Sequence, residues 1–401
     1  MKRGFFLLII TIIVLSLITI VLVRYAQGYR LVFSKNIFQK NSIKLTSTGI
    51  LAATSVPDGA SIYIDDHLTS ATNSSLDLPP GDYTVKIVKE GYLPWEKKLT
   101  IQKEVVTQTQ ALLFPTAPKL ESLTTSGALN PAVDPSGTSI AFGVASSSAI
   151  RKNGIYVLDM TAKPILTLRN ASTQIADDTS NTLSRGIFTW SPNGRELIVE
   201  TKSPSQSTYL LQQGGFTATP PDITATRNFT KTQWQREKEE IEKARLDSLK
   251  PKLASFIQKN FNIVAWSNDD TKILYEASQS ATLEQFITPP LVGTNSQPEE
   301  RNIQKGKLYI YDSKEDKNFF IKNVVDTSLP APVWFPDNRH IVYIEDKQIK
   351  IMEYDGGNKT VVYSGPFDAN FVYPWPDGSA LVILTSLQGG GTPNLYSINL
   401  K

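Results

Sequence analysis

The sequence has no cysteine and only two histidines, His67 and His340, among its 401 residues. Without thiol groups the chain cannot form a disulfide, use a thiolate nucleophile, or bind zinc or an iron–sulfur cluster through sulfur. Two histidines are too few for a histidine-rich metal site. We therefore expect no metal ion and no cofactor, whereas the lack of disulfides does not identify a cellular compartment.

The sequence also lacks the short motifs of common enzymes. It has no Gly-x-Ser-x-Gly elbow for a serine nucleophile, no Gly-rich phosphate loop and no dinucleotide fingerprint. Neither histidine lies in a motif with a nucleophile and an acid. The 38 acidic residues leave room for a carboxylate pair, but no motif singles one out. We predict no catalytic residue and a protein that is not an enzyme.

Acidic residues are missing from the first 57 positions, which hold seven basic residues. The rest of the chain has 34 basic and 38 acidic residues, so its body carries a small negative charge. A protein that binds nucleic acid usually has a basic body. We therefore expect no nucleic-acid partner.

Charge is also absent from residues 4–23, which read GFFLLIITIIVLSLITIVLV. At ~1.5 Å per residue, a helix of this length spans ~30 Å, the thickness of the apolar core of a bilayer. A signal peptide would have a shorter apolar region and a small-residue cleavage site, but Arg24 follows this run. The sequence predicts an uncleaved single-pass anchor within residues 1–23, with membrane lipid as its partner.

The orientation of this anchor does not follow from charge, because basic residues are equally frequent on its two sides. By analogy with single-pass envelope proteins, we expect a cell-membrane protein with an extracytoplasmic body. Residues 24–47 are predicted to form a basic juxtamembrane stalk. This stalk lies either against anionic headgroups or free in solvent.

Alternating apolar residues mark short strands in residues 48–114. Ala60 and Ile62, for example, fall on one face of a strand. The segments 57–59 and 79–82 combine Pro, Asp and Gly, which favour tight turns. Several short strands in so few residues predict a small antiparallel β-sandwich.

Four separated elements of this module fall in a recognisable order. They are Ser55-x-Pro57-x-Gly59-Ala60, then Ile64-Asp65, then Leu78-Pro79-Pro80-Gly81-x-Tyr83-x-Val85, then Gly91-Tyr92 and Trp95. Together they resemble the PEGA domain. The sequence departs from the family at Asp66-His67, where the family more often has Gly after Asp. The resemblance implies an envelope-associated module that binds a ligand and is not an enzyme.

Two features of the PEGA-like module are candidates for function. Tyr92 and Trp95 form either an exposed aromatic platform for a glycan or a peptide, or a pair that packs in the core. Asp65, Asp66 and His67 suggest a metal or acid–base site, but a turn capped by Asp side chains is the more ordinary interpretation. We name Tyr92 and Trp95 as the candidate binding surface.

A tight turn preceded, in most copies, by an aromatic residue recurs through residues 115–401. The fourth positions of the five turns are Gly137, Gly194, Asp270, Asn338 and Gly378. Pro suits the second position of such a turn, and Gly or Asn suits a position with positive φ. Each turn is followed by an alternating strand and then by a second strand. Because one such unit cannot bury both of its faces, neighbouring units must stack.

The stretch Trp-Ser-Pro-Asn-Gly at 190–194 and its four variants resemble the TolB-like, or WD40-like, β-propeller repeats of bacterial envelope proteins. The resemblance covers about 119–401 and implies about five blades, with a degenerate sixth within 281–305 as an alternative. In the last copy, at 375–378, the aromatic stands one place nearer the turn. Segment 119–125 has no hairpin partner, so we expect it to pair with the last blade and close the ring.

A charge-dense segment near 228–260 interrupts the repeats. Glu, Lys and Arg recur there at helical spacings, and Pro251 breaks the pattern. We predict an inserted helix, which is either a partner-binding arm or a solvated helix packed lightly on the ring.

The predicted fold class is mainly β, with an N-terminal transmembrane helix, a PEGA-like sandwich and a C-terminal propeller with a helical insertion. We expect a non-enzymatic, membrane-anchored envelope protein. Its modules bind protein partners or a cell-wall glycan. The alternatives are a propeller-based hydrolase or lyase that uses funnel carboxylates, and a purely structural scaffold.

Overall fold

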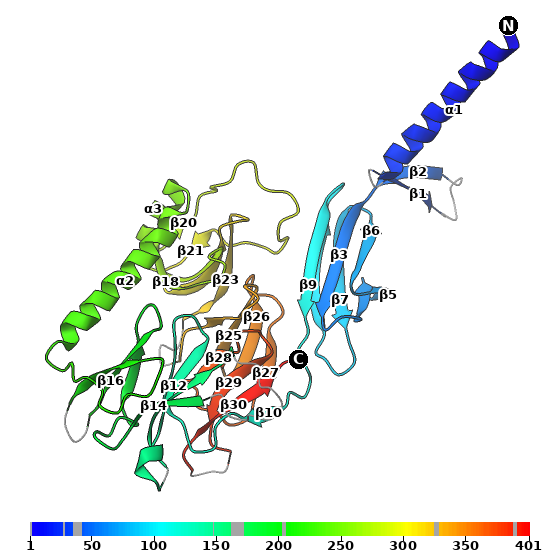
Figure 1. Cartoon of the computed structure of the whole chain (residues 1–401). Coiled ribbons are helices and arrows are strands. Elements are labelled where there is room, and N and C mark those ends of the chain that lie inside the picture. Colours follow the sequence, from blue (N-terminus) through cyan, green and yellow to red (C-terminus); the bar gives the residue numbers. More distant parts are fainter. Residues whose placement is uncertain are drawn as a thin grey trace. The chain divides into compact units, whose positions relative to one another are not determined.

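The computed structural model describes residues 2–26, 29–34, 42–146, 148–161, 172–202, 206–324, 329–387 and 391–401, with side chains at 9–23 and from residue 47 onward within these ranges. Strands dominate, which confirms the mainly-β prediction (Figure 1). The chain divides into two compact units. The first unit is Met1–Leu113 with Ile287–Pro298, and the second is Phe114–Phe286 with Glu299–Lys401.

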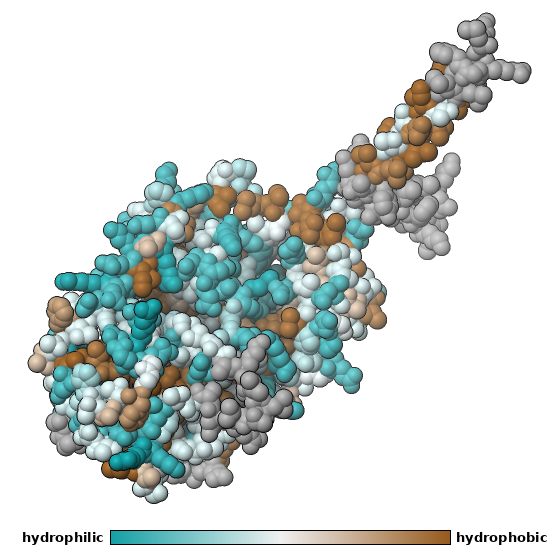
Figure 2. All heavy atoms as spheres, in the orientation of Figure 1, coloured by the Kyte–Doolittle hydropathy of each residue, from teal (hydrophilic) through white to brown (hydrophobic). Residues whose placement is uncertain are grey.

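The apolar N-terminal run forms helix α1 (Lys2–Ala26), whose described side chains, at 9–23, are exposed and mostly apolar (Figure 2). The described part of the chain contains no helix that is both long enough and apolar enough to span a membrane. The prediction of a single-pass anchor in the cell membrane is therefore wrong, and the lipid contact expected through it loses its basis.

Two paired strands lie where the basic stalk was predicted. Strand β1 (Tyr29–Ser34) runs antiparallel to β2 (Ser42–Ser47), with Tyr29 opposite Ser47. The rest of the predicted stalk includes residues 27–28 and 35–41, which lie outside the described residues.

The PEGA-like segment folds into two small sheets. The first, in the order β6-β3-β9, contains β3 (Gly49–Val56), β6 (Ser74–Leu78) and β9 (Val106–Leu112). The second, in the order β5-β4-β7-β8, contains β4 (Ser61–Ile64), β5 (His67–Ala71), β7 (Gly81–Val88) and β8 (Trp95–Ile101). A shared core of buried side chains confirms the sandwich. The antiparallel prediction is wrong for one pair, because β3 and β9 run parallel.

A segment distant in the sequence completes this unit. Residues 287–298 belong to the first unit and lie against β8, which is an edge strand of its sheet. Gln297 Nε2 donates to the carbonyl oxygen of Lys98 (2.6 Å), and the Thr100 N–H donates to Ser296 Oγ (3.3 Å). The segment therefore satisfies backbone groups that an edge strand leaves unpaired.

The second unit contains, within the described residues, five antiparallel sheets of three or four strands, which we number in chain order (Figure 1). Sheet 1 contains β11 (Leu129–Val133), β12 (Ser139–Val144), β13 (Gly154–Asp159) and β14 (Ser172–Asp177), with a short 3-10 helix, η1 (Ile150–Lys152). Sheet 2 contains β15 (Ile187–Trp190), β16 (Glu196–Glu200) and β17 (Thr208–Gln212). Sheet 3 contains β18 (Phe261–Trp266), β19 (Lys272–Ala277), β22 (Lys307–Asp312) and β23 (Lys317–Asn323). Sheet 4 contains β24 (Val333–Trp334), β25 (His340–Glu345), β26 (Gln348–Glu353) and β27 (Thr360–Tyr363). Sheet 5 contains β28 (Val372–Pro374), β29 (Ala380–Thr385), β30 (Asn394–Asn399) and β10 (Leu120–Ser122).

The five predicted turns each join the first two strands of a sheet. In every turn the fourth residue has positive φ, between 55° and 71°, and its N–H bonds the carbonyl of the first residue at 2.8–3.1 Å. The prediction of a repeated strand–turn–strand unit is confirmed. The last sheet also confirms that segment 119–125 pairs with the end of the chain, because β10 lies antiparallel to β30 with Glu121 opposite Ser397.

Neighbouring sheets of this unit bury apolar faces against one another. Sheet 1 shares one core with sheet 2 and another with sheet 5, and sheet 3 shares a core with sheet 4. The Trp190 indole N–H of sheet 2 donates to the Ala132 carbonyl of sheet 1 (3.0 Å). Likewise, Trp334 of sheet 4 donates to Ala265 of sheet 3 (3.3 Å). In sheets 2 and 4, the Trp before the turn thus links its sheet to the preceding one.

The charged insertion forms two helices, α2 (Arg227–Asp247) and α3 (Pro251–Asn260). Leu246, Leu253 and Ile257 of these helices are buried with Tyr275 and Tyr311 of sheet 3. The helical prediction is confirmed, but α3 and the end of α2 do not pack lightly. They cover the face of sheet 3 that carries Trp266, whereas the equivalent faces of sheets 2 and 4 pack on the preceding sheet.

Helix α2 contacts sheets 2 and 3 through opposite ends. Lys231 pairs with Glu200 of β16 (2.8 Å), and Arg245 pairs with Asp270 in the turn of sheet 3 (2.9 Å). Between these contacts, Ile241 remains 46% exposed.

The stretch 281–305 contains no sixth four-stranded sheet. Its described strands are β20 (Ala281–Thr282) and β21 (Asn302–Ile303), which pair only with each other. The residues between them contribute to the first unit instead.

Candidate binding pocket

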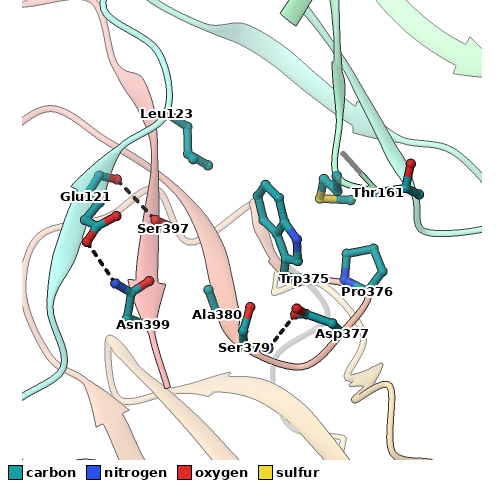
Figure 3. Close-up of a pocket in the computed structure, with 11 residues that line it drawn as sticks. Glu121, Leu123, Thr161, Trp375, Pro376, Asp377, Ser379, Ala380, Ser397 and Asn399 are labelled. Atoms are coloured by element: carbon teal, nitrogen blue, oxygen red, sulfur yellow. Dashed lines mark hydrogen bonds between the residues drawn. The ribbon is translucent and has the colours of Figure 1, made fainter. Parts of the chain in front are cut away.

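A cavity of about 410 Å³ lies in the second unit, beside sheet 5 and the end of β13 in sheet 1 (Figure 3). Its lining is Glu121, Leu123, Met160, Thr161, Trp375, Pro376, Asp377, Ser379, Ala380, Ser397 and Asn399. This volume falls within the ~300–1,000 Å³ range of small-molecule sites. The cavity combines apolar walls with a few polar groups, which is the usual composition of a ligand pocket.

Trp375 lines this pocket because of its position relative to the turn. In sheets 2, 3 and 4 the Trp stands at the place before the turn and is at most 8% exposed. In sheet 5 that place is Pro374, and Trp375 is the first residue of the turn. Successive side chains of a strand point to opposite faces, so a shift of one residue re-aims the ring. Trp375 is half-buried and contacts the core that sheets 1 and 5 share.

The presence of Trp375 as the first turn residue also changes the hydrogen bonding of the third turn residue, Asp377. In sheets 2 and 3 the first turn residue is Ser, whose hydroxyl hydrogen-bonds the side chain of Asn193 (2.8 Å) or Asp269 (2.7 Å). Trp375 cannot supply that hydroxyl. The Asp377 carboxylate accepts the Ser379 N–H at Oδ1 (2.8 Å). The side chain of Ser379 also hydrogen-bonds this carboxylate.

The ionised form of Asp377 is favoured. Burial acts to raise the pKa of its carboxyl, but the hydrogen bonds from Ser379 and the charge of Lys401 outweigh it. The pKa of Asp377 is consequently lowered from its usual 3.8. The pocket therefore holds a negative charge at neutral pH.

A second carboxylate comes from the strand that pairs with the end of the chain. Glu121 of β10 accepts Asn399 Nδ2 of β30 at Oε1 (3.1 Å). Ser397 Oγ contacts the Glu121 carbonyl oxygen (3.5 Å), also across this strand pair. Glu121 and Asn399 thus reach the pocket only because β10 and β30 pair (Figure 3).

The structure does not make an exposed platform of Tyr92 and Trp95. Trp95 begins β8 and is only 3% exposed, within the core of the PEGA-like sandwich. Tyr92 is half-buried and packs against the same core. The platform interpretation of this pair is wrong because the alternation of β8 turns Trp95 inward, and the core-packing alternative is the one observed.

The segment Asp65-Asp66-His67 forms a turn, as its more ordinary interpretation predicted. Asp65 and Asp66 both have positive φ, between β4 and β5. Asp65 Oδ1 accepts the Thr84 N–H (2.8 Å), and His67 Nδ1 lies 2.8 Å from the Asp65 carbonyl. Among the described residues, no group of three or more His, Asp or Glu side chains has a metal-binding arrangement.

His340 is the one deeply buried histidine among the described residues. Its Nδ1 lies 2.6 Å from Asp337 Oδ2, and its ring contacts Phe114 and Phe335 edge-on. Asp337 also accepts the N–H groups of Arg339 and His340. This pair belongs to the turn of sheet 4 and stabilises it.

Sequence reasoning missed the pocket, although one of its signals was visible. The displacement of Trp375 relative to its turn could be read from the repeat alignment. To place Glu121 in the pocket, one would need the exact register of β10 against β30. No local sequence pattern provides that register.

Comparison with protein families identifies one domain. Residues 48–116 match the PEGA domain family model, which confirms the resemblance found in the sequence. A search of curated proteins found no match to this chain.

Solved structures similar to this chain include several propellers. Putative TolB from Agrobacterium tumefaciens is 14% identical, with 68% of this chain and 72% of that chain covered and a TM-score of 0.21. TolB from Acinetobacter baumannii is 13% identical, with 79% and 60% covered and a TM-score of 0.23. The Cps50 (Swd1) β-propeller domain from Myceliophteria thermophila is 9% identical, with 71% and 100% covered and a TM-score of 0.25. The family match is thus confined to residues 48–116, and the chain as a whole is mainly β with propellers among its structural neighbours.

Proposed function

We propose that this chain is a non-enzymatic binding protein whose main ligand site is the pocket beside Trp375. One observation carries the proposal: the pocket combines an aromatic wall with two carboxylates, each of which has more acceptor sites than its existing hydrogen bonds use. Aromatic side chains supply rigid apolar area, and the polar groups orient a ligand. The partner expected from the sequence, a protein or a glycan, can contact both the aromatic wall and the polar groups.

The proposal includes a finer statement about the fold. The five sheets of the second unit form a single propeller-like array, in which β10 completes sheet 5. The support for it is the repeated strand–turn–strand unit, the cores shared by sheets 1 and 2, 1 and 5, and 3 and 4, and the pairing of β10 with β30. The pocket then lies where the beginning and the end of the array meet.

The experiment is a screen of the full chain against immobilised peptides and glycans of known structure. Wild type is compared with Trp375→Ala and with Phe229→Ala, a control that removes an aromatic side chain that is 73% exposed on α2. We expect at least one ligand whose binding falls about tenfold or more in Trp375→Ala and is unchanged in Phe229→Ala. Ligand binding that is equal in all three proteins would contradict the proposed site.

A hydrolase is a second candidate because Glu121 and Asp377 both line the cavity. Glycoside hydrolases use such a pair of carboxylates, one as acid and one as base or nucleophile. The discriminating measurement is product formation from each bound glycan over several hours. Turnover that is lost in both Glu121→Gln and Asp377→Asn would favour the hydrolase, whereas binding without product favours the binding protein.

A further inference from the structure

The charges that line the Trp375 pocket all have one sign. Glu121 and Asp377 are its ionisable residues, and no Lys, Arg or His is among its described lining residues. An anionic ligand would meet two like charges there. A neutral ligand would displace water from both carboxylates without supplying a positive charge in its place.

Both carboxylates keep acceptor capacity for an incoming donor. Asp377 uses Oδ1 for the Ser379 N–H, and Glu121 uses Oε1 for Asn399. The Ser379 side chain also hydrogen-bonds the Asp377 carboxylate, whereas Oε2 of Glu121 has no donor within the described residues. A carboxylate has about four lone-pair sites, so a positively charged donor can bind without breaking the existing contacts.

An ammonium group already approaches the rim of this pocket. Lys401 Nζ donates to the Asp377 carbonyl oxygen (2.9 Å), and its charge contributes to the lowered pKa of the Asp377 carboxyl. The same turn in sheet 4 has no such contact, because there His340 donates to Asp337 instead. The turn of sheet 5 thus already has a cation at its rim, as the turn of sheet 3 has Arg245 beside Asp270.

The apolar wall suits the stem of a long basic side chain. Trp375, Pro376, Met160 and Leu123 provide it, and Figure 3 shows the indole standing between Leu123 and Thr161. Lys and Arg place their methylene groups along apolar surface while the charged head stays polar. An aromatic face also attracts a cation that lies within ~6 Å of the ring centroid.

We propose that this pocket binds the side chain of a lysine or arginine presented by an exposed basic segment of a partner protein. The proposal rests on the proposed binding function and names its ligand class. The stem packs on Trp375 and the charged head bonds to Glu121 and Asp377. A phosphorylated or acidic segment is rejected by the same two carboxylates.

Fluorescence polarisation with three labelled tetrapeptides tests this proposal on the full chain. Tetralysine and tetraarginine are expected to bind at least tenfold more tightly than tetraglutamine at 50 mM salt. Because exposed ion pairs are screened, the preference should shrink several-fold at 500 mM salt. Equal affinity for tetralysine and tetraglutamine would overturn the proposal.

Matched variants separate the pocket from general surface charge. Glu121→Gln and Asp377→Asn keep the contacts to Asn399 and Ser379, and each should weaken tetralysine binding about three- to tenfold. Glu240→Gln removes the same charge from the exposed surface of α2 and should have no effect. Equal affinity in all three variants would overturn the proposal, and a far-UV circular dichroism spectrum confirms that each is folded.

A neutral probe makes the two proposals fail separately. If chitotetraose binds in a way that Trp375→Ala abolishes, while tetralysine does not bind, the binding function stands and the cationic ligand is wrong. If no tetrapeptide and no glycan binding depends on Trp375, both proposals are wrong.

Discussion

The same place before the turn is occupied by Trp190, Trp266 and Trp334. Their indole N–H groups nevertheless differ in whether they have a hydrogen-bond acceptor. Those of Trp190 and Trp334 donate to a carbonyl of the preceding sheet. The Trp266 Nε1 is buried without a hydrogen-bond partner, and it is the one such side-chain atom among the described residues. The reason is that helices α2 and α3, and not sheet 2, cover its face of sheet 3.

This difference predicts unequal costs for the same substitution. Trp190→Phe breaks a buried hydrogen bond and leaves the Ala132 carbonyl unpaired, whereas Trp266→Phe removes a buried donor that has no acceptor. Beyond the loss of ring area common to both, we expect Trp190→Phe to lower the free energy of unfolding by about 1–2 kcal/mol more. Urea denaturation followed by circular dichroism measures this difference. Equal losses in the two variants would show that Trp266 has an acceptor in solution.

Asp337 predicts a dependence of stability on acid pH. Burial acts to raise the pKa of its carboxyl, but hydrogen bonds from His340 and from the N–H groups of Arg339 and His340 lower the pKa below the usual 3.8. A lowered pKa in the folded state stabilises the fold above about pH 4, and this contribution is lost as the pH falls through the folded value.

The corresponding variant is Asp337→Asn, which keeps the size of the side chain. It should be less stable than wild type at pH 7 by about 1 kcal/mol and should lose less stability between pH 5 and pH 3. Thermal unfolding across this pH range measures both effects, with Glu240→Gln as the control for a general change in charge. Parallel pH profiles for wild type and Asp337→Asn would refute the assignment.

At the scale of elements, the insertion of α2 and α3 replaces a sheet-to-sheet contact with a helix-to-sheet contact. Ile257 of α3 is fully buried against sheet 3, whereas Ile241 of α2 is 46% exposed between the two ends of its helix. The two helices therefore contribute unequally to the core of this unit. Helix α3 contributes Leu253 and Ile257 to the core on sheet 3. Helix α2 contributes Leu246 at its end, buries Trp234 and adds ion pairs at sheets 2 and 3.

Truncation of these two isoleucines tests that division. Ile257→Ala should destabilise the protein by about 2–5 kcal/mol, because it removes buried methyl groups and leaves a cavity. Ile241→Ala should change stability by less than about 0.5 kcal/mol. The midpoint of urea unfolding reports both changes. Similar losses in both variants would mean that the middle of α2 is also packed.

At this scale, the sequence predicted the features that depend on neighbouring residues, namely the turns and the strands. Turn residues such as Gly194 and Asn338 require positive φ, and the alternation after each turn fixes a strand, so both were visible in a short window. The parallel pairing of β3 with β9 was not visible, because Ile50 and Val106 are partners only after the chain has crossed to the other sheet. The same limit hid the pocket, whose Glu121 and Trp375 lie on elements far apart in the sequence.

The burial of Trp95 shows a different limit. Its neighbours in sequence are compatible with an exposed platform as well as with a core position. Only the register of β8 against β7, with Trp95 opposite Ile87, turns the indole toward the sandwich core. For α1, apolarity predicted the helix, while the described helices contain none fit to span a membrane.

At the scale of the whole molecule, the β10–β30 pair joins the first strand of the second unit to its last strand. This pair covers the outer side of β30, aligns Glu121 with Asn399 and completes sheet 5. Because the pair connects the early and late parts of this unit's chain, its loss should loosen the unit as a whole and not one sheet alone.

A covalent bond across this pair should stabilise the unit. Ser122 lies opposite Tyr396 in the register, and the native chain has no cysteine, so Ser122→Cys with Tyr396→Cys creates a single possible disulfide. Closing so long a loop restricts the unfolded chain and should add up to about 5 kcal/mol when the geometry is unstrained. Urea midpoints are compared with and without reductant, with Ser122→Cys alone as the control. Failure of the disulfide to form in air would place the two strands apart.

The β10–β30 pair also constrains how the protein is made. Glu121 leaves the ribosome long before its partner Asn399, which lies 278 residues later. At ~5–20 residues per second, synthesis of the intervening chain takes about 14–56 s. During that interval β10 has no native neighbour, so this unit cannot finish folding until translation has almost reached residue 400. Chaperones that shield nascent strands would therefore act on this segment for longer than on any hairpin of the array.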